Sequence, residues 1–298
     1  MRKDLIRNIA IIAHVDHGKT TLLDGMLKQS GIYRENQQVT ERVMDSMDLE
    51  RERGITIMAK NTAVMYNDIK INIVDTPGHA DFGGEVERSL NLVDGAILLV
   101  DASEGPLPQT RFVVKKALDK ELPIILVINK IDRPDQRIEQ VITDVYDLFI
   151  DLDASEAQIE FPILCTNAKL GVAHNTLDDG SRDLRPLFDT IVAEIPGPEA
   201  DDDATPQFVV NNLDYDTHVG QIAIGRLFNG TLEMNQKYCL CGEEENLPGV
   251  KFSGLYTFQN LKRKRVEKVF AGDIIALAGV KNIKIGDTIS ALENPEPL

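Results

Sequence analysis

An eight-residue motif near the start of the chain constrains its fold more than any other feature. The motif, Ala13-His14-Val15-Asp16-His17-Gly18-Lys19-Thr20, follows a strand pattern at Asn8–Ala13 and opens a helical pattern at Lys19–Gln29. It matches the phosphate-binding loop of nucleotide-binding α/β domains, except that Ala13 replaces the first glycine. Alanine fits if its backbone φ is negative, since only positive φ strictly favours glycine. Taken alone, the motif also fits an ordinary strand–turn–helix corner.

Such a loop offers backbone N–H groups and a helix N-terminus to the phosphates of a nucleotide. Lys19 would contact the β- and γ-phosphates, Thr20 would ligate Mg²⁺, and Thr21 could reach the α-phosphate. The other loop residues predicted to contact the nucleotide are Asp16, His17 and Gly18. Asp16 either holds a monovalent cation near the phosphates or braces the loop with its carboxylate.

Residues 8–195 alternate short β-branched runs with helical patterns, which predicts an α/β domain with a mostly parallel sheet. The expected strands are Asn8–Ala13, Thr62–Tyr66, Lys70–Val74, Ala96–Asp101, Pro123–Ile128 and Phe161–Cys165. The expected helices are Lys19–Gln29, Gly84–Leu92, Pro108–Leu118, Pro134–Phe149 and Leu184–Glu194. The polar residues 31–58 between them predict a long, conformationally labile segment.

The composition changes after Ile195, where two prolines, a glycine and an acidic run form a linker pattern. Short strand-like runs separated by turn residues follow, at Phe208–Leu213, Gln221–Phe228, Gln236–Leu240 and Asp273–Ala278. They predict a small antiparallel β-barrel. We therefore expect a nucleotide-binding domain at 1–197, a linker at 198–204 and a β-barrel domain at 205–298.

A second motif, Asp75-Thr76-Pro77-Gly78-His79, follows the strand predicted at Lys70–Val74. Asp75 could reach Mg²⁺ through water, as the second acidic metal-binding group of P-loop nucleoside triphosphatases does. Gly78 could donate its backbone N–H to the γ-phosphate. In the labile segment, Thr56 could ligate Mg²⁺ only when the γ-phosphate is present. A Pro-Gly turn and a short exposed strand are the plainer interpretations of these two segments.

A third motif, Asn129-Lys130-Ile131-Asp132, follows the most apolar predicted strand. The Asp132 carboxylate can accept hydrogen bonds from N1–H and the exocyclic amine of guanine, a donor pair that adenine lacks. Lys130 would lie along the ring, and Asn129 would tie this loop to the phosphate loop. In Asn167-Ala168-Lys169, the Ala168 N–H would donate to the guanine carbonyl. The three motifs in order predict a site for GTP or GDP with Mg²⁺.

The net charge of −16 excludes RNA binding through the overall field of the chain, so RNA would have to meet small basic patches. The densest basic run, Lys262–Arg265, is either a solvated barrel loop or a contact for ribosomal RNA. The three cysteines form no disulfide framework and favour reduced, structural thiols. No apolar run reaches the roughly 18 residues of a membrane span.

With these motifs placed, the chain resembles the translational GTPases, and within them the BipA/TypA family. The match rests on Arg7–Leu22, Glu41–Lys60, Ile73–Arg88, Leu107–Phe112, Asn129–Pro134 and, in the barrel, Leu213-Asp214-Tyr215, Ile224-Gly225-Arg226 and Ala271-Gly272-Asp273. The resemblance implies a bacterial, cytoplasmic, monomeric protein that acts on the ribosome, and no DNA or membrane partner. It also implies further C-terminal domains, so this sequence is expected to be an N-terminal fragment.

The resemblance assigns catalysis to His79, which would orient the attacking water, with Val15 and Ile55 as an apolar gate. The motifs contain no evident arginine finger, so we expect slow intrinsic hydrolysis that ribosomes accelerate. Two other classes stay open: a GTP-controlled binding switch, and a P-loop ATPase or nucleotide kinase. Asp132 and the lack of a lid-like segment disfavour the latter.

Overall fold

The computed structural model describes residues 1–30, 60–76, 83–177 and 179–298. These residues form two compact units. One unit comprises Ile9–Pro196, and the other comprises Met1–Asn8 together with Gly197–Leu298. The domain boundaries that the sequence indicates, 1–197 and 205–298 with a linker at 198–204, remain a prediction.

The first unit contains a seven-stranded sheet in the order β2-β3-β1-β4-β5-β6-β7. Its strands are β1 (Ile6–Ala13), β2 (Lys60–Tyr66), β3 (Ile69–Asp75), β4 (Gly95–Asp101), β5 (Ile124–Asn129), β6 (Ile163–Asn167) and β7 (Val172–His174). The pairs β1–β4, β4–β5 and β5–β6 are parallel, whereas β2–β3 and β6–β7 are antiparallel. The predicted α/β class with a mostly parallel sheet is therefore confirmed.

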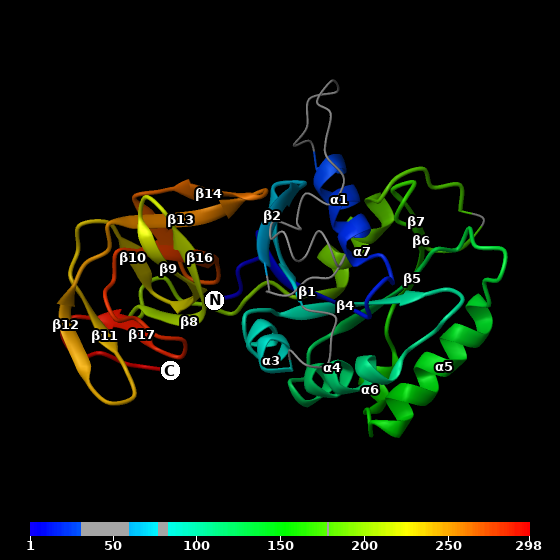
Figure 1. Cartoon of the computed structure of the whole chain (residues 1–298), viewed down its shortest axis with the longest axis horizontal. Coiled ribbons are helices and arrows are strands. Elements are labelled where there is room, and N and C mark those ends of the chain that lie inside the picture. Colours follow the sequence, from blue (N-terminus) through cyan, green and yellow to red (C-terminus); the bar gives the residue numbers. More distant parts are fainter. Residues whose placement is uncertain (31–59, 77–82, 178) are drawn as a thin grey trace. The chain divides into compact units, whose positions relative to one another are not determined.

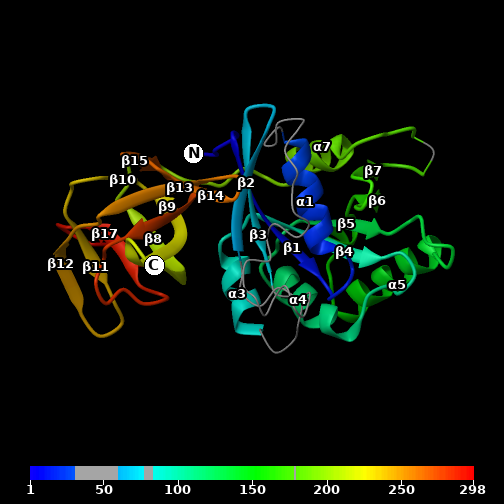
Figure 2. The same cartoon turned by 45° about the horizontal axis from the view of Figure 1, so that its top comes forward.

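Helices cover both faces of this sheet (Figures 1 and 2). They are α1 (Lys19–Gln29), α3 (Gly83–Asn91), α4 (Pro108–Asp119), α5 (Ile138–Asp151), α6 (Glu156–Ile159) and α7 (Arg185–Glu194). Helices α1 and α7 share one face, and α3, α4 and α5 lie across the other. Leu23 and Met26 of α1 and Phe188 of α7 are buried in one core with the strands. Each such side chain contributes roughly 1.5–3 kcal/mol by leaving water.

In the first unit, three departures from the predicted elements stand out. Helix α5 begins at Ile138 instead of Pro134, because residues 134 and 135 form a turn and the Arg137 N–H donates to the Ala102 carbonyl at 2.8 Å. The short helix α6 and the short strand β7 were not predicted. Both are only three or four residues long, too short to show a periodic pattern.

The second unit is built from antiparallel strands. They are β8 (Gln207–Asp216), β9 (Gly220–Asn229), β10 (Thr231–Glu233), β11 (Tyr238–Cys241), β12 (Asn246–Val250), β13 (Gly254–Gln259), β14 (Lys262–Arg265), β15 (Lys268–Phe270), β16 (Ile274–Ala278) and β17 (Thr288–Ala291). Eight of these strands form one sheet in the order β12-β11-β17-β8-β9-β16-β13-β14, and β10 pairs with β15. Residues from strands along this sheet, including Phe208, Leu255 and Ile289, meet in one core. The sheet therefore curls around that core, in agreement with the predicted antiparallel β domain.

The first residues of the chain belong to this second unit. The Met1 ammonium donates to the Ala200 carbonyl at 2.9 Å, and the Ala200 N–H donates back to the Met1 carbonyl at 3.0 Å. The Lys3 N–H donates to the Pro198 carbonyl at 2.9 Å. These bonds pair the N-terminus with residues 198–200, so the segment before β1 is ordered by residues that are far away in the sequence.

Candidate nucleotide-binding site

The carboxyl ends of four parallel strands gather the polar residues of the site at one edge of the sheet. In the strand register, Ala13 lies opposite Leu99, Asp101 opposite Asn129, and Asn129 opposite Thr166. The segments that follow these strands therefore start side by side. In open α/β sheets, ligands bind at this edge.

The loop after β1 contains two residues in the left-handed region. Positive φ values occur at Asp16 (65°) and at Gly18 (98°), which caps helix α1, but not at Ala13, the last residue of β1. Alanine is therefore accommodated without backbone strain. A Cβ on Gly18 would lie 2.3 Å from the Asn129 amide nitrogen, so glycine is required there for both conformation and space.

Lys19 is buried at the start of α1 and directs its ammonium toward the end of β3. Its Nζ lies 2.9 Å from Asp75 Oδ1 and also donates to the Thr76 carbonyl. Asp75 is fully buried, and the Thr76 hydroxyl donates to the Ile11 carbonyl at 2.7 Å. The structure thus brings together the predicted phosphate-binding lysine and the predicted metal-associated carboxylate.

Asn129 connects three segments of the site through its side-chain amide. Its Nδ2 donates to the His17 carbonyl at 2.8 Å. Its Oδ1 accepts from the Thr166 hydroxyl at 3.1 Å and from the Ala168 N–H at 3.0 Å. With 1% of its surface exposed, this amide fixes the phosphate loop against the loop after β6.

The Ala168 bond differs from the expectation that this N–H donates to a guanine carbonyl. In the structure the N–H donates to Asn129 instead. The Asn167 side chain accepts the Leu170 N–H at 3.1 Å and closes a turn. Asparagine suits this position because its side chain caps turns of this kind.

A cleft of about 520 Å³ lies beside these loops. It is lined by Thr21, Asp24, Gly25, Lys28, Gln29, Asn129, Lys130, Asp132, Arg133 and Asn167–Gly171. Asp132 is exposed at its rim, and the Lys130 ammonium lies 2.8 Å from Asp101 Oδ2. The predicted base-reading residues Lys130, Asp132, Asn167, Ala168 and Lys169 therefore share one cleft.

Asp101 is a buried carboxylate of the site that the sequence analysis did not single out. It is fully buried and contacts Lys130 and Arg133. In the sequence, Asp101 is marked only by its position: it is an acidic residue at the end of an apolar strand pattern, and the next strand pattern precedes Asn129.

Four predicted residues lie outside the described residues: Ile55, Thr56, Gly78 and His79. Their proposed contacts with the metal, the γ-phosphate and water therefore remain predictions. Asp16 is exposed in the phosphate loop, and its two alternative roles both stay open.

The donor set of the phosphate end suits Mg²⁺. Thr20 supplies a hydroxyl and Asp75 a buried carboxylate, and Mg²⁺ prefers oxygen ligands. Among the described residues, no three His, Cys, Asp or Glu side chains converge on a possible metal position. A Mg²⁺ ion held here would therefore complete its coordination with phosphate oxygens and water, as it does in phosphate-transfer sites.

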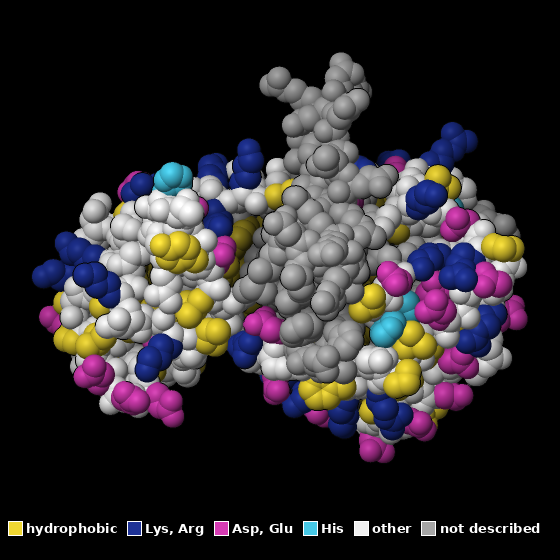
Figure 3. Space-filling view, in the orientation of Figure 1, with side chains coloured by type: hydrophobic (Ala, Val, Ile, Leu, Met, Phe, Trp, Pro, Cys, Tyr) yellow, Lys and Arg dark blue, Asp and Glu magenta, His cyan; other side chains and the backbone are white. Residues whose placement is uncertain are grey.

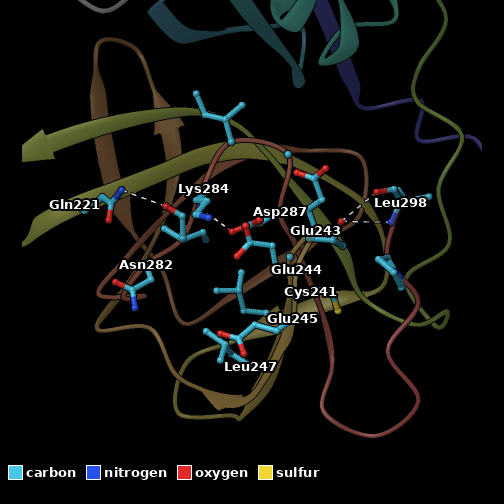
Figure 4. A pocket seen from close by; sticks show the side chains of 17 residues that line it. Gln221, Cys241, Glu243, Glu244, Glu245, Leu247, Asn282, Lys284, Asp287 and Leu298 are labelled. Carbon is cyan, nitrogen blue, oxygen red and sulfur yellow. Dashed lines mark hydrogen bonds between the residues drawn. The ribbon is translucent and has the colours of Figure 1, made fainter.

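A larger cleft, of about 820 Å³, lies in the second unit (Figure 4). Glu243, Glu244, Glu245 and Asp287 line it, against one basic residue, Lys284. The Asp287 carboxylate accepts the Lys284 backbone N–H at 2.7 Å. The acidic lining repels a polyphosphate, so the smaller cleft is the candidate nucleotide site.

The charged side chains on the surface of the described residues are mixed in sign. On the face in Figure 3, acidic and basic side chains are interspersed over both units without one continuous basic patch. Cys165, Cys239 and Cys241 are free and buried. No helix in the described segments combines the length and apolarity needed to cross a membrane.

Comparison with known proteins places the chain among defined families. The profile described as "Elongation factor Tu GTP binding domain" matches residues 4–197, and that described as "Elongation factor G domain 2" matches residues 206–292. A crystal structure of a protein from Thermus thermophilus superposes with a TM-score of 0.73 over 99% of this chain and 55% of that chain. At 18% identity, this likeness shows the fold alone.

Two relatives match the whole chain. "Large ribosomal subunit assembly factor BipA" of Bacillus subtilis is 50% identical over 298 residues, which cover 100% of this chain and 48% of the relative. "Putative elongation factor TypA-like SVR3, chloroplastic" of Arabidopsis thaliana is 49% identical over 297 residues, which cover 100% of this chain and 44% of the relative. The chain thus spans about half the length of these relatives.

The two profile matches, a GTP-binding domain followed by an elongation factor G domain 2, define the class of translational GTPases. The chain belongs to the family of the elongation factor Tu GTP-binding domain, and its relatives within that family are the BipA and TypA proteins. The resemblance drawn from the motifs is therefore confirmed.

His17 is the buried titratable group of the phosphate loop. Its Nδ1 lies 3.4 Å from the Leu99 carbonyl oxygen, and its Nε2 lies 3.4 Å from Glu104 Oε2. Burial lowers the pKa of His17, and the neighbouring His14 acts in the same direction. These effects outweigh the Leu99 carbonyl, Glu104 and Asp101, which raise the pKa.

This pKa shift predicts a pH dependence of stability. Because the folded state lowers the pKa of His17, the unfolded state binds the proton more tightly, and stability falls as the pH drops below about 6.5. We expect the nucleotide-free chain to lose thermal stability between about pH 7 and pH 5. His17→Asn should make that loss smaller, measured by circular dichroism melts.

His218→Asn is the matched control, because His218 is exposed in the turn between β8 and β9. It should leave the pH dependence of the wild type intact. Equal pH dependence in His17→Asn and the wild type would contradict the assignment.

Proposed function

We propose that this chain binds GTP with Mg²⁺ and hydrolyses it as the N-terminal part of a translational GTPase that acts on the ribosome. The observation that carries the proposal is the Asn129 amide, which joins the phosphate loop to the loop after β6 at the base cleft. The Lys19–Asp75 pair lies at the phosphate end, and Asp132 lies on the rim of the cleft.

At the phosphate end, Lys19 would exchange its contacts with Asp75 and Thr76 for phosphate oxygens. A phosphate accepts charge-assisted bonds from ammonium groups, and the N-terminus of α1 favours negative charge. Thr20 and Asp75 would hold Mg²⁺, which neutralises charge on the phosphates. Thr21 and the backbone of Asp16, His17 and Gly18 would complete the phosphate contacts.

At the base end, Asp132 would accept the two donors of guanine, with Lys130 along the ring. Asn167, Ala168 and Lys169 line the same cleft. The Ala168 N–H already donates to Asn129 Oδ1, so a guanine carbonyl that accepted from this N–H would compete with Asn129 for the same hydrogen. The base preference therefore rests on Asp132.

The partner is proposed from the relatives. The Bacillus subtilis relative is named a large ribosomal subunit assembly factor. We infer that the full-length protein meets ribosomal RNA and proteins in the cytoplasm, as a monomer. The basic run Lys262–Arg265 is not the loop that the sequence suggested but the edge strand β14, where Arg263 binds Asp214 at 2.9 Å. Lys262, Lys264 and Arg265 are exposed there, which fits both a solvated edge and an RNA contact.

The base preference is tested by Asp132→Asn. The amide presents a donor where guanine also presents donors, so GDP affinity should fall at least about 100-fold. Xanthine carries a carbonyl in place of the exocyclic amine, so affinity for xanthosine diphosphate should rise. Both constants are measured by calorimetric titration in Mg²⁺.

Asp135→Asn provides a matched control three positions along the same segment, because Asp135 is exposed and lines no part of the cleft. Its nucleotide affinities should equal those of the wild type. Undiminished GDP binding by Asp132→Asn would reject the base-reading role.

Hydrolysis is tested by His79→Ala in the full-length protein. If His79 orients the attacking water, ribosome-stimulated turnover should fall about 100-fold or more, while GTP binding and ribosome co-sedimentation persist. Steady-state phosphate release is measured with and without ribosomes. Unchanged turnover would remove the catalytic role, and equal wild-type rates with and without ribosomes would remove the stimulation.

A binding switch is the second candidate function. In that case GTP controls docking and hydrolysis serves only release. GTP-dependent ribosome binding by a His79→Ala protein that cannot hydrolyse GTP, with release from the ribosome lost, would favour it.

A further inference from the structure

We propose that Asp101 is a positioning residue of the nucleotide site, whose buried carboxylate holds Lys130 in place for the base. The inference rests on the proposed guanine-nucleotide function and adds a residue to it. Asp101 is the last residue of β4 and lies opposite Asn129 in the strand register. The two buried side chains therefore emerge beside each other at the edge where the cleft begins.

One carboxylate oxygen faces the base-reading segment. Asp101 Oδ2 lies 2.8 Å from the Lys130 ammonium and 3.4 Å from Arg133 Nη1. The carboxylate is fully buried, whereas 31% of the Lys130 side chain is exposed. The buried carboxylate of Asp101 therefore restricts the more exposed Lys130 side chain.

The other carboxylate oxygen shapes the turn after β4. Asp101 Oδ1 accepts from the Ser103 N–H at 2.8 Å, the Ser103 hydroxyl at 2.7 Å and the Glu104 N–H at 3.3 Å. This turn sets the Glu104 carboxylate 3.4 Å from Nε2 of His17 in the phosphate loop. Asp101 thus contacts the base-reading segment directly, and it reaches His17 of the phosphate loop indirectly, through the turn that holds Glu104.

Lys130 needs such a partner because its backbone is unusual. Its φ is +63°, in the left-handed region that side-chain-bearing residues adopt at a free-energy cost. A segment in this conformation keeps its shape only when its surroundings hold it. Asp101 supplies that hold from the neighbouring strand.

The charge state of Asp101 supports the pairing. Burial by itself would raise the pKa of this carboxyl, but hydrogen bonds from Lys130 and Ser103 hold the pKa below its usual range. Asp101 is therefore ionised at neutral pH. A buried carboxylate left without its cations would be strongly destabilising, so the pair is maintained.

The test is a double-mutant cycle on GDP affinity in Mg²⁺, with Asp101→Asn, Lys130→Met and the double variant. Asparagine keeps an acceptor for the Ser103 turn but removes the charge that holds Lys130. We expect the Asp101→Asn substitution to weaken GDP binding about 10-fold when Lys130 is present. In the Lys130→Met background, the same substitution should weaken GDP binding less than about 2-fold.

Two further readouts separate positioning from general support of the fold. The ratio of GDP to inosine diphosphate affinity should stay unchanged in Asp101→Asn, because Asp132 still reads the exocyclic amine. Asp135→Asn removes the exposed carboxylate that binds Arg133 at 2.8 Å, and it should leave GDP affinity within about 2-fold of the wild type.

Each outcome decides the proposal. An equal loss of affinity in both backgrounds, or no loss in Asp101→Asn, would overturn it while wild-type GDP binding still supports the proposed function. A wild type that binds no GDP would overturn the function itself.

Should Asp101→Asn fail to fold, amine acylation of the nucleotide-free wild type decides instead. Lys130 should react several-fold more slowly than the exposed Lys120. Equal rates would show that Asp101 does not hold Lys130.

Discussion

The site depends on one buried amide. Asn129 donates to the carbonyl of His17 in the phosphate loop and accepts from Thr166 in β6 and from Ala168 just after it. The His17 carbonyl and the Ala168 N–H lie outside the helices and strands, so without Asn129 these buried groups would be unpaired, at a cost of about 1–3 kcal/mol each. The close contact between Gly18 and this amide shows how tightly the loop packs against it. The phosphate end and the base end are therefore formed by one hydrogen-bond network.

Charge is then placed around this amide in two separate pairs. Lys19 meets Asp75 at the phosphate end, and Lys130 meets Asp101 at the base end. In both pairs the carboxylate is fully buried and belongs to a strand end, while the ammonium belongs to the loop or helix that follows a neighbouring strand. The fixed anions orient the cations before any nucleotide is bound. A chain with a net charge of −16 can in this way hold individual ammonium groups in place at the site.

The sequence predicted the α/β class and the antiparallel β domain because motifs and periodic patterns are local properties. It also placed Lys19, Asp75, Asn129 and Asp132 at strand ends, and the structure brings them to one edge. Asp101 was not predicted, because its contacts with Lys130 and Arg133 arise from the register of β4 against β5. The grouping of Met1–Asn8 with Gly197–Leu298 was not predicted either, since it depends on pairing between the N-terminus and residues 198–200, which are far apart in the sequence. The helix start predicted at Pro134 was overridden by a tertiary hydrogen bond from the Arg137 N–H to the Ala102 carbonyl.

The central claim is that this edge of the sheet selects a guanine nucleotide. Calorimetric titration of the wild-type chain with GDP and with ADP, both in Mg²⁺, tests it most directly. A cleft that reads guanine through Asp132 should bind GDP at least about 100-fold more tightly than ADP, because adenine lacks the donor pair that the Asp132 carboxylate accepts. Equal affinities for the two nucleotides would contradict the account.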